Sequence, residues 1–143
     1  MNRVRPATVV DVPAMQRLRL QVRENVLSDP GLVTESMVLK SISEAGSGWV
    51  FEENNEILGF SIALRDDPSI WALFVLPQHE GKGIGHTLLK EAVDWLWSLG
   101  AIRICLGTEA GTRAERFYRE RGWKDSGLKE NGEIMFVLER KID

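Results

Sequence analysis

The chain has 143 residues with 18 basic and 21 acidic side chains, so its formal net charge is −3. This length fits one domain over residues 1–143, because a second domain would be too small to bury its own core. The acidic balance argues against nucleic acid as a partner. No apolar run reaches the ~18 residues that a membrane span needs, so no membrane partner is expected. The single cysteine, Cys105, can form no internal disulfide, which fits a cytoplasmic location.

The first half of the chain predicts two helices followed by antiparallel strands. Thr8 and Thr34 are suited to cap helices, and adjacent asparagines favour the left-handed conformation of a tight hairpin. In chain order we expect a strand at residues 3–7, a helix from Thr8, a turn at Asp29-Pro30-Gly31, a helix from Thr34 to Ala45, and strands at 49–51 and 56–65 joined at Asn54-Asn55.

The second half predicts a parallel pair of strands connected through a helix. Residues 70–76 form a continuous apolar run, which is typical of a strand buried on both faces. A strand, a helix and another strand in succession favour a parallel, right-handed connection. The remaining expected elements are a helix from residue 84 to Gly100, a strand at 101–106, a helix at 112–121 and a hairpin of 123–128 with 134–138. The predicted fold is therefore an α/β three-layer domain with a mixed sheet.

A glycine-rich turn, Glu80-Gly81-Lys82-Gly83-Ile84-Gly85-His86-Thr87, joins the buried strand to its helix. Glycines at alternate positions leave backbone N–H groups free to converge on an anion at the positive end of the helix. The spacing lacks the Gly-x-Gly-x-x-Gly of dinucleotide-binding domains, and no Gly-Lys-Ser/Thr of a Walker A loop is present. The turn therefore predicts a pyrophosphate site of another kind, with a tight turn of purely structural origin as the alternative.

A second motif, Ala114-x-x-Phe117-Tyr118-x-x-x-Gly122-Trp123, follows the glycine turn. Together with Val75-x-Pro77, these residues resemble the GNAT superfamily of acyl-CoA-dependent N-acyltransferases over about residues 70–124. The earlier strands and helices are also similar to that fold. The resemblance implies a GNAT-like α/β/α domain with a mostly antiparallel sheet of about seven strands, splayed between strands 4 and 5, and about four helices.

The resemblance also implies acetyl-CoA as the co-substrate, with its pyrophosphate on the glycine turn and its pantetheine arm along a bulged strand 70–76. Two positions depart from the family pattern. Glu80 stands where Gln or Arg is usual, and Gly111 stands where an Asn is common, with Thr108, Thr112 or Arg113 as substitutes. The implied cofactor-binding residues are Leu73, Phe74, Val75, Gly81, Lys82, Gly83, Ile84, Gly85, His86 and Thr87.

The family places a general acid at Tyr118, the only tyrosine, where a phenol with an ordinary pKa of about 10 could protonate the leaving thiolate. A backbone N–H of Phe74 or Val75 is the expected oxyanion donor. No carboxylate stands near the start of the bulged strand, so Glu109 is the candidate base. An ordered water chain is the alternative. Asp66, Asp67 and Glu35 are further candidates for the acceptor side.

The leading hypothesis is an N-acetyltransferase acting on a small-molecule or peptide amine. The alternative is a CoA-binding sensor or protein-interaction domain with the same fold and little turnover, and a different acyl group is also open. Two histidines and one cysteine, scattered along the chain, predict no metal site. The oligomeric state stays open, with a homodimer through the final hairpin as one alternative.

Overall fold

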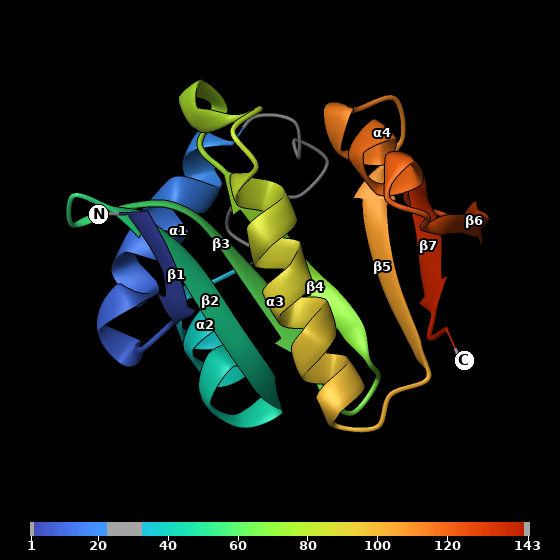
Figure 1. Ribbon diagram of the computed structural model, residues 1–143, viewed down its shortest axis with the longest axis horizontal. Helices are drawn as coiled ribbons and strands as arrows, with labels where there is room; N and C mark the ends of the chain where they lie inside the picture. Colours follow the sequence, from blue (N-terminus) through green and yellow to red (C-terminus); the bar gives the residue numbers. More distant parts are fainter. Residues whose placement is uncertain (1, 23–32, 142–143) are drawn as a thin grey trace.

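The computed structural model describes residues 2–22 and 33–141. These residues form one seven-stranded sheet in the order β1-β2-β3-β4-β5-β7-β6, with helices on both faces (Figure 1). The strands are Asn2–Pro6 (β1), Gly46–Glu53 (β2), Glu56–Leu64 (β3), Ser69–Val75 (β4), Arg103–Glu109 (β5), Lys124–Leu128 (β6) and Glu133–Glu139 (β7). The α-helices in the described part are Val12–Gln21 (α1), Glu35–Lys40 (α2), Ile84–Ser98 (α3) and Arg113–Glu120 (α4).

The predicted elements are present, with small shifts at their ends. The helix expected from Thr8 begins as a 3-10 turn over Val9–Asp11 (η1) before α1, and α2 continues as a wider π-helical turn over Ser41–Ala45 (η3). Asn54 and Asn55 have φ of 51° and 64°, which confirms the tight hairpin between β2 and β3. The turn expected at residues 29–31 lies outside the described residues.

The two faces of the sheet are covered by different helices. On one face, the Ser61 hydroxyl of β3 donates to the backbone carbonyl of Leu88 in α3, at 3.0 Å. On the other face, the guanidinium of Arg19 in α1 lies 5.5 Å from the centre of the Phe74 ring in β4. Since side chains alternate along a strand, Leu73 and Val75 face α3 whereas Phe74 faces α1.

The sheet is nearly divided between β4 and β5. These strands run parallel, as predicted, but their ladder holds one residue pair, Ser69 with Cys105. The register between β3 and β4 shifts at Ile62/Ala63, which leaves Trp71 as a bulge in β4. Beyond this point β4 and β5 diverge (Figure 1). The expected splay between strands 4 and 5 is therefore confirmed.

Strand β4 consequently has an open side. The N–H of Leu76 donates to the carbonyl of Leu58 at 2.9 Å, so backbone groups of even-numbered residues here point toward β3. By alternation, the N–H and C=O groups of Leu73 and Val75 point toward β5, where the ladder has ended.

Among the described residues, none of the helices has both the length and the apolar composition of a membrane-spanning helix.

A partly buried ion-pair network anchors the start of α1 to the edge of the sheet. Arg5 in β1 donates to both carboxylate oxygens of Asp11, at 2.8 and 2.9 Å, and to Glu52 in β2 at 3.1 Å. Asp11 also accepts from the backbone N–H of Thr8 at 2.8 Å. The Arg5 guanidinium lowers the pKa of the Asp11 carboxyl, against the opposing effect of burial.

We expect Asp11→Ala to lower the free energy of unfolding at pH 7 by roughly 3 kcal/mol, because it leaves Arg5 without its main partner. Arg5 depresses the Asp11 pKa, so this contribution is complete above the ordinary carboxyl value of about 4 and disappears as the pH falls through the depressed value. Urea unfolding at several pH values measures both effects.

The matched control is Arg3→Ala, since Arg3 is largely exposed and its nitrogen lies 3.9 Å from Glu52. We expect a loss below about 1 kcal/mol for this variant. Equal losses for Asp11→Ala and Arg3→Ala would contradict a special role of the partly buried pair.

Candidate active site

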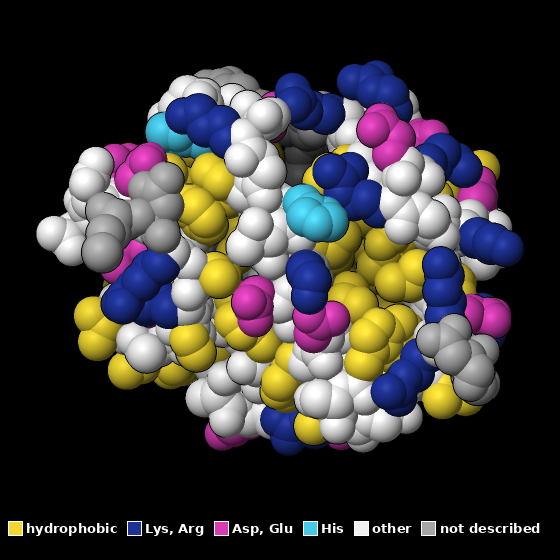
Figure 2. Space-filling view, in the orientation of Figure 1, with side chains coloured by type: hydrophobic (Ala, Val, Ile, Leu, Met, Phe, Trp, Pro, Cys, Tyr) yellow, Lys and Arg dark blue, Asp and Glu magenta, His cyan; other side chains and the backbone are white. Residues whose placement is uncertain are grey.

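A cavity occupies the opening between β4 and β5. It has a volume of about 530 Å³ and extends from the glycine turn and α4 to Val22 at the end of α1. Figure 2 shows exposed hydrophobic side chains in this hollow, with basic side chains and a histidine gathered near the start of α3. The cavity therefore combines an apolar floor with a cationic rim.

The glycine turn has a left-handed backbone at two of its glycines. Gly81 and Gly83 have φ of +82° and +86°, values that L side chains rarely adopt, and Gly83 is the N-cap residue of α3. Gly85 lies inside the helix, and a Cβ built on it would meet Phe117 and Val75 at ordinary contact distances of 3.5 to 3.6 Å. The turn therefore requires glycine for its backbone at positions 81 and 83.

The residues expected to bind cofactor divide into two sets. Lys82 and Thr87 do not line the cavity. Lys82 lies 3.0 Å from the ring nitrogen of His79, and the Thr87 hydroxyl donates to the Gly83 carbonyl at 3.0 Å. The other predicted cofactor-binding residues all line the cavity: Leu73, Phe74, Val75, Gly81, Gly83, Ile84, Gly85 and His86.

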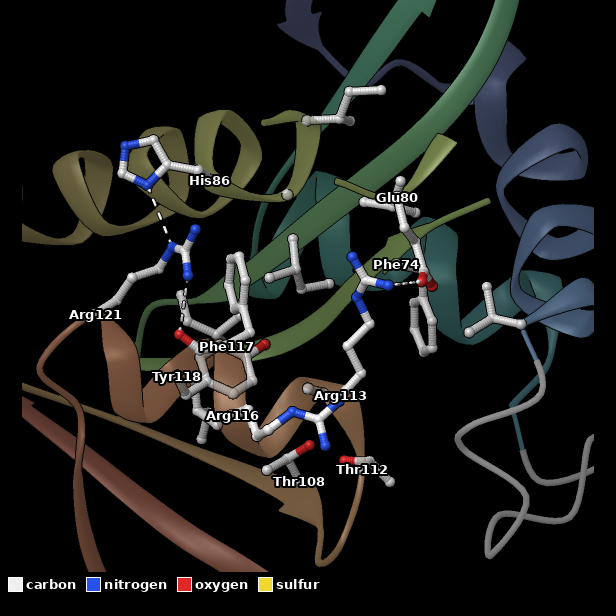
Figure 3. Close-up of a pocket in the computed structure, with 18 of the residues that line it drawn as sticks. Phe74, Glu80, His86, Thr108, Thr112, Arg113, Arg116, Phe117, Tyr118 and Arg121 are labelled. Atoms are coloured by element: carbon white, nitrogen blue, oxygen red, sulfur yellow. Dashed lines mark hydrogen bonds and ion pairs between the residues drawn. The ribbon is translucent and has the colours of Figure 1, made fainter. Parts of the chain in front are cut away.

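Glu80 is paired with an arginine from α4. The Arg113 guanidinium reaches the Glu80 carboxylate at 3.1 Å, across the cavity between the glycine turn and α4 (Figure 3). The carboxylate at this unusual position is thus neutralised by a cation. A nitrogen of Arg113 would lie 3.6 Å from a Cβ on Gly81, so its positive charge stands directly beside the turn.

Gly111 and Thr112 form the start of α4 through local hydrogen bonds. Gly111 has a φ of +80°, and its N–H donates to the Glu115 carboxylate at 2.8 Å. The Thr112 hydroxyl donates to the carbonyl of Glu109 at 2.7 Å and accepts from the N–H of Glu115 at 3.2 Å. Gly111 and Thr112 therefore fix the entry of α4, and Thr108 and Thr112 both line the cavity.

Tyr118 is held in α4 by aromatic contacts on several sides. Its ring centre lies 5.3 Å from Phe117, 5.8 Å from Trp123 and 6.0 Å from Phe136. Burial raises the pKa of the Tyr118 phenol above its ordinary value. Tyr118 lines the cavity, and its hydroxyl makes no hydrogen bond to the described residues. The phenol is thus a fixed, protonated donor at the cavity wall.

Phe117 and Arg121 form the other side of the rim, in a position that the sequence motif alone does not reveal. The Arg121 guanidinium lies 3.7 Å from the centre of the Phe117 ring, and it donates to the Phe117 carbonyl at 3.1 Å and toward the His86 ring at 3.4 Å (Figure 3). Phe117 is the phenylalanine of the Phe-Tyr motif, so its presence was visible in the sequence, but its stacking partner was not.

Glu109 ends β5 and lines the same cavity as Tyr118. One of its carboxylate oxygens, Oε2, is buried without a hydrogen-bond partner in the described part of the chain. The other acidic candidates do not join it, because Glu35, Asp66 and Asp67 are exposed and line no part of this cavity. Of the sequence-predicted acidic candidates, Glu109 is therefore the one that lines the cavity.

A sheet opened between two parallel strands, with a glycine-rich turn beside the opening, is the architecture of an α/β domain of the N-acetyltransferase class. Residues 15–123 match the Acetyltransferase (GNAT) family. The chain therefore belongs to this family, which uses acetyl-CoA, and the predicted fold class and enzyme class are confirmed.

Known proteins similar to this chain agree with that assignment. The chain is 27% identical to the [ribosomal protein bS18]-alanine N-acetyltransferase of Haemophilus influenzae over 81 residues, which are 55% of this chain and 56% of that protein. It is 29% identical over 133 residues to the uncharacterized N-acetyltransferase YhfO of Bacillus subtilis, covering 85% of this chain and 89% of that protein.

A solved structure shares the fold over nearly the whole chain. The PaiA N-acetyltransferase from Thermoplasma acidophilum, in complex with coenzyme A, superposes with a TM-score of 0.80. Its sequence is 15% identical, and the alignment covers 98% of this chain and 99% of that chain. At this identity the comparison supports the architecture of the domain.

We expect Arg113→Gln to weaken acetyl-CoA binding by roughly tenfold, because it leaves the Glu80 carboxylate uncompensated beside an anion site. The same substitution made in a Glu80→Gln background should cost clearly less. Calorimetric titration of the two single variants and the double variant with acetyl-CoA measures this coupling. Equal losses in both backgrounds would show that Glu80 does not act through Arg113.

Proposed function

We propose that the protein transfers the acetyl group of acetyl-CoA to the primary amine of a small molecule or peptide by direct attack of the amine. The observation that carries this proposal is the arrangement of one cavity. It places the glycine turn, the open backbone of β4, Tyr118 and Glu109 around a common space. These are the parts that binding, polarisation and two proton transfers require.

The residues present fit acetyl-CoA. Backbone N–H groups at Gly81 and Gly83 and the start of α3 offer donors to a pyrophosphate, and Arg113 and Arg121 add positive charge at the rim. Leu73 and Val75 offer unpaired backbone groups to the amides of a pantetheine arm, in the manner of an added strand. When bound, acetyl-CoA supplies an activated thioester carbonyl with CoA thiolate as the leaving group.

Val75 is the favoured oxyanion donor of the two residues predicted for this role. The strand alternation directs its N–H into the open gap, whereas the backbone groups of Phe74 point to β3. A fixed backbone donor stabilises the negative charge that develops on the carbonyl oxygen. In the proposed reaction the C–N bond forms as the C–S bond breaks.

Tyr118 and Glu109 handle the protons. The Tyr118 hydroxyl donates its proton to the departing sulfur, and the Glu109 carboxylate accepts a proton from the attacking nitrogen. The products are the N-acetylated amine and CoA. Burial raises the Tyr118 pKa, so the phenol keeps its proton until the thiolate departs.

The acceptor is to be identified by chromatographic detection of CoA released in the presence of amines. The panel contains polyamines, aminoglycosides, amino acids and peptides, including peptides with an N-terminal alanine because one relative is named for acetylating that residue of a ribosomal protein. Release that depends on one class of amine supports the proposal. Tight binding of acetyl-CoA without release for any amine would instead support a CoA-binding sensor.

We expect Tyr118→Phe to lower kcat by about 100-fold or more, the usual contribution of a general acid, with little change in acetyl-CoA affinity. The ring contacts with Phe117, Trp123 and Phe136 remain in this variant. Steady-state kinetics and calorimetry measure the two effects separately. Unchanged turnover would remove Tyr118 from the mechanism.

The raised pKa of Tyr118 also sets a pH dependence. Because the folded phenol holds its proton above the ordinary value of about 10, kcat of the wild type should show no decline between pH 7 and pH 9.5. A decline in this range with an apparent pKa near 8 would indicate a different acid.

We expect Glu109→Gln to lower the rate at neutral pH by about 100-fold. The loss should shrink as the pH approaches the pKa of the amine, because an amine that is already neutral needs less help from a base. The matched control is Glu120→Gln, since Glu120 also lines the cavity but is exposed. A pH-independent loss would favour a structural role for Glu109.

A further inference from the structure

Arg19 lies next to two residues of the cavity wall, Val22 and Phe74, on the α1 side of the sheet. It lies one helical turn before Val22, whose N–H donates to the Arg19 carbonyl at 3.3 Å. Its guanidinium lies 5.5 Å from the centre of the Phe74 ring. Val22 and Phe74 both line the cavity, so Arg19 borders the cavity from the α1 face of the sheet.

The charge of Arg19 has no counter-ion in the described part of the chain. Its side chain is partly buried and touches an aromatic face, but it forms no ion pair or hydrogen bond with the described residues. Desolvation by burial lowers its pKa from the ordinary value. The guanidinium therefore has five N–H donors in a planar fork. Because a partly buried charge without a partner is unfavourable, binding an anion here would stabilise it.

This position differs from the other arginines of the cavity. Arg113 is the first residue of α4 and pairs with Glu80. Arg121 follows the last residue of α4 and contacts Phe117 and His86. They lie on the α3 and α4 face, beside the turn that fits phosphates. Arg19 lies across β4 from them, because Phe74 faces α1 while Val75 faces α3. The gap between β4 and β5 connects the two faces.

We propose that the amine acceptor carries a carboxylate and that Arg19 binds it, so that the protein acetylates amino acids and related amino carboxylates. This inference rests on the proposed function and specifies its acceptor. With phosphates held on the α3 face, the acceptor enters from the α1 face and passes Arg19 and Phe74 on its way to the thioester. A bidentate contact between guanidinium and carboxylate fixes the orientation of the acceptor as well as its affinity.

The local charge argues against purely cationic acceptors. A polyamine or aminoglycoside entering beside Arg19 would bring like charges together in a partly buried site, which is destabilising. The net charge of −3 belongs to the whole chain and acts at long range, whereas Arg19 acts at the acceptor end of the cavity. Specificity at this site therefore follows Arg19.

The test compares acceptors that differ only in the carboxylate. Initial rates are measured for a set of L-amino acids and their α-amides, and for β-alanine and its amide. The amides have the more weakly basic amines, so chemistry alone favours them at neutral pH. We expect the wild type to prefer the acids by tenfold or more in kcat/KM. We expect Arg19→Gln to lose this preference through a rise of about tenfold or more in KM for the acids.

Two further variants separate charge from packing. Arg19→Lys keeps the charge without the planar fork and should retain part of the preference. Arg17→Gln removes an exposed arginine from the same helix, on the wall of a different groove, and should leave the preference intact. Acetyl-CoA affinity of all three variants should equal that of the wild type, which also shows that they fold.

The outcomes distinguish the inference from the function on which it rests. Turnover of amines with equal or better rates for the amides would overturn the carboxylate inference and leave the acetyltransferase proposal standing. Turnover of no amine would overturn the acetyltransferase proposal. In that case calorimetry with N-acetyl amino acids and N-acetyl amino amides, added to the CoA-loaded protein, still decides the inference, since failure to bind the acids better than the amides overturns it.

Discussion

The separation of β4 from β5 is the constraint on which the site depends. Two parallel strands that would normally share a full ladder are joined at Ser69 and Cys105 alone. The bulge at Trp71 and the connection through α3 turn β4 away from its neighbour, so its backbone groups are available to a ligand. Every other feature of the site uses this opening. The glycine turn stands at its mouth, α4 forms one wall, and α1 closes its far side.

Charge is arranged around the opening in a way that a count of residues does not show. The chain is acidic overall, yet the cavity is bordered by Arg19, Arg113 and Arg121. An unpaired Glu80 carboxylate would repel an anion bound at the turn. Its ion pair with Arg113 neutralises this charge and holds the guanidinium beside the turn. The Glu80–Arg113 pair is therefore close to neutral, and the positive end of α3 together with Arg121 supplies the remaining positive charge beside the turn.

Local patterns in the sequence predicted the order of the elements, the glycine turn and the tight hairpin, whereas the open strand and the role of Tyr118 were implied by the resemblance to the GNAT family. These features depend on residues near one another in the chain, such as the glycines of the turn and the asparagines of the hairpin. The Glu80–Arg113 pair and the stacking of Arg121 on Phe117 could not be predicted, because they join segments brought together by the tertiary fold. The position of Arg19 beside Phe74 could not be predicted either, because a basic residue in a helix normally indicates a face exposed to solvent. The reason for Gly111 lies in a left-handed backbone, which sequence alone does not display.

The open side of β4 has a further consequence for the behaviour of the protein in solution. An unpaired strand is usually a template for another chain, and proteins protect such edges against aggregation. Here the unpaired side lies inside the sheet, recessed between α3 and α4 on one face and bounded by β5. Because α3, α4 and β5 surround it, this side of β4 is less open to a strand of another molecule than a free sheet edge is. The same recess that admits a ligand therefore also guards the protein against intermolecular strand pairing.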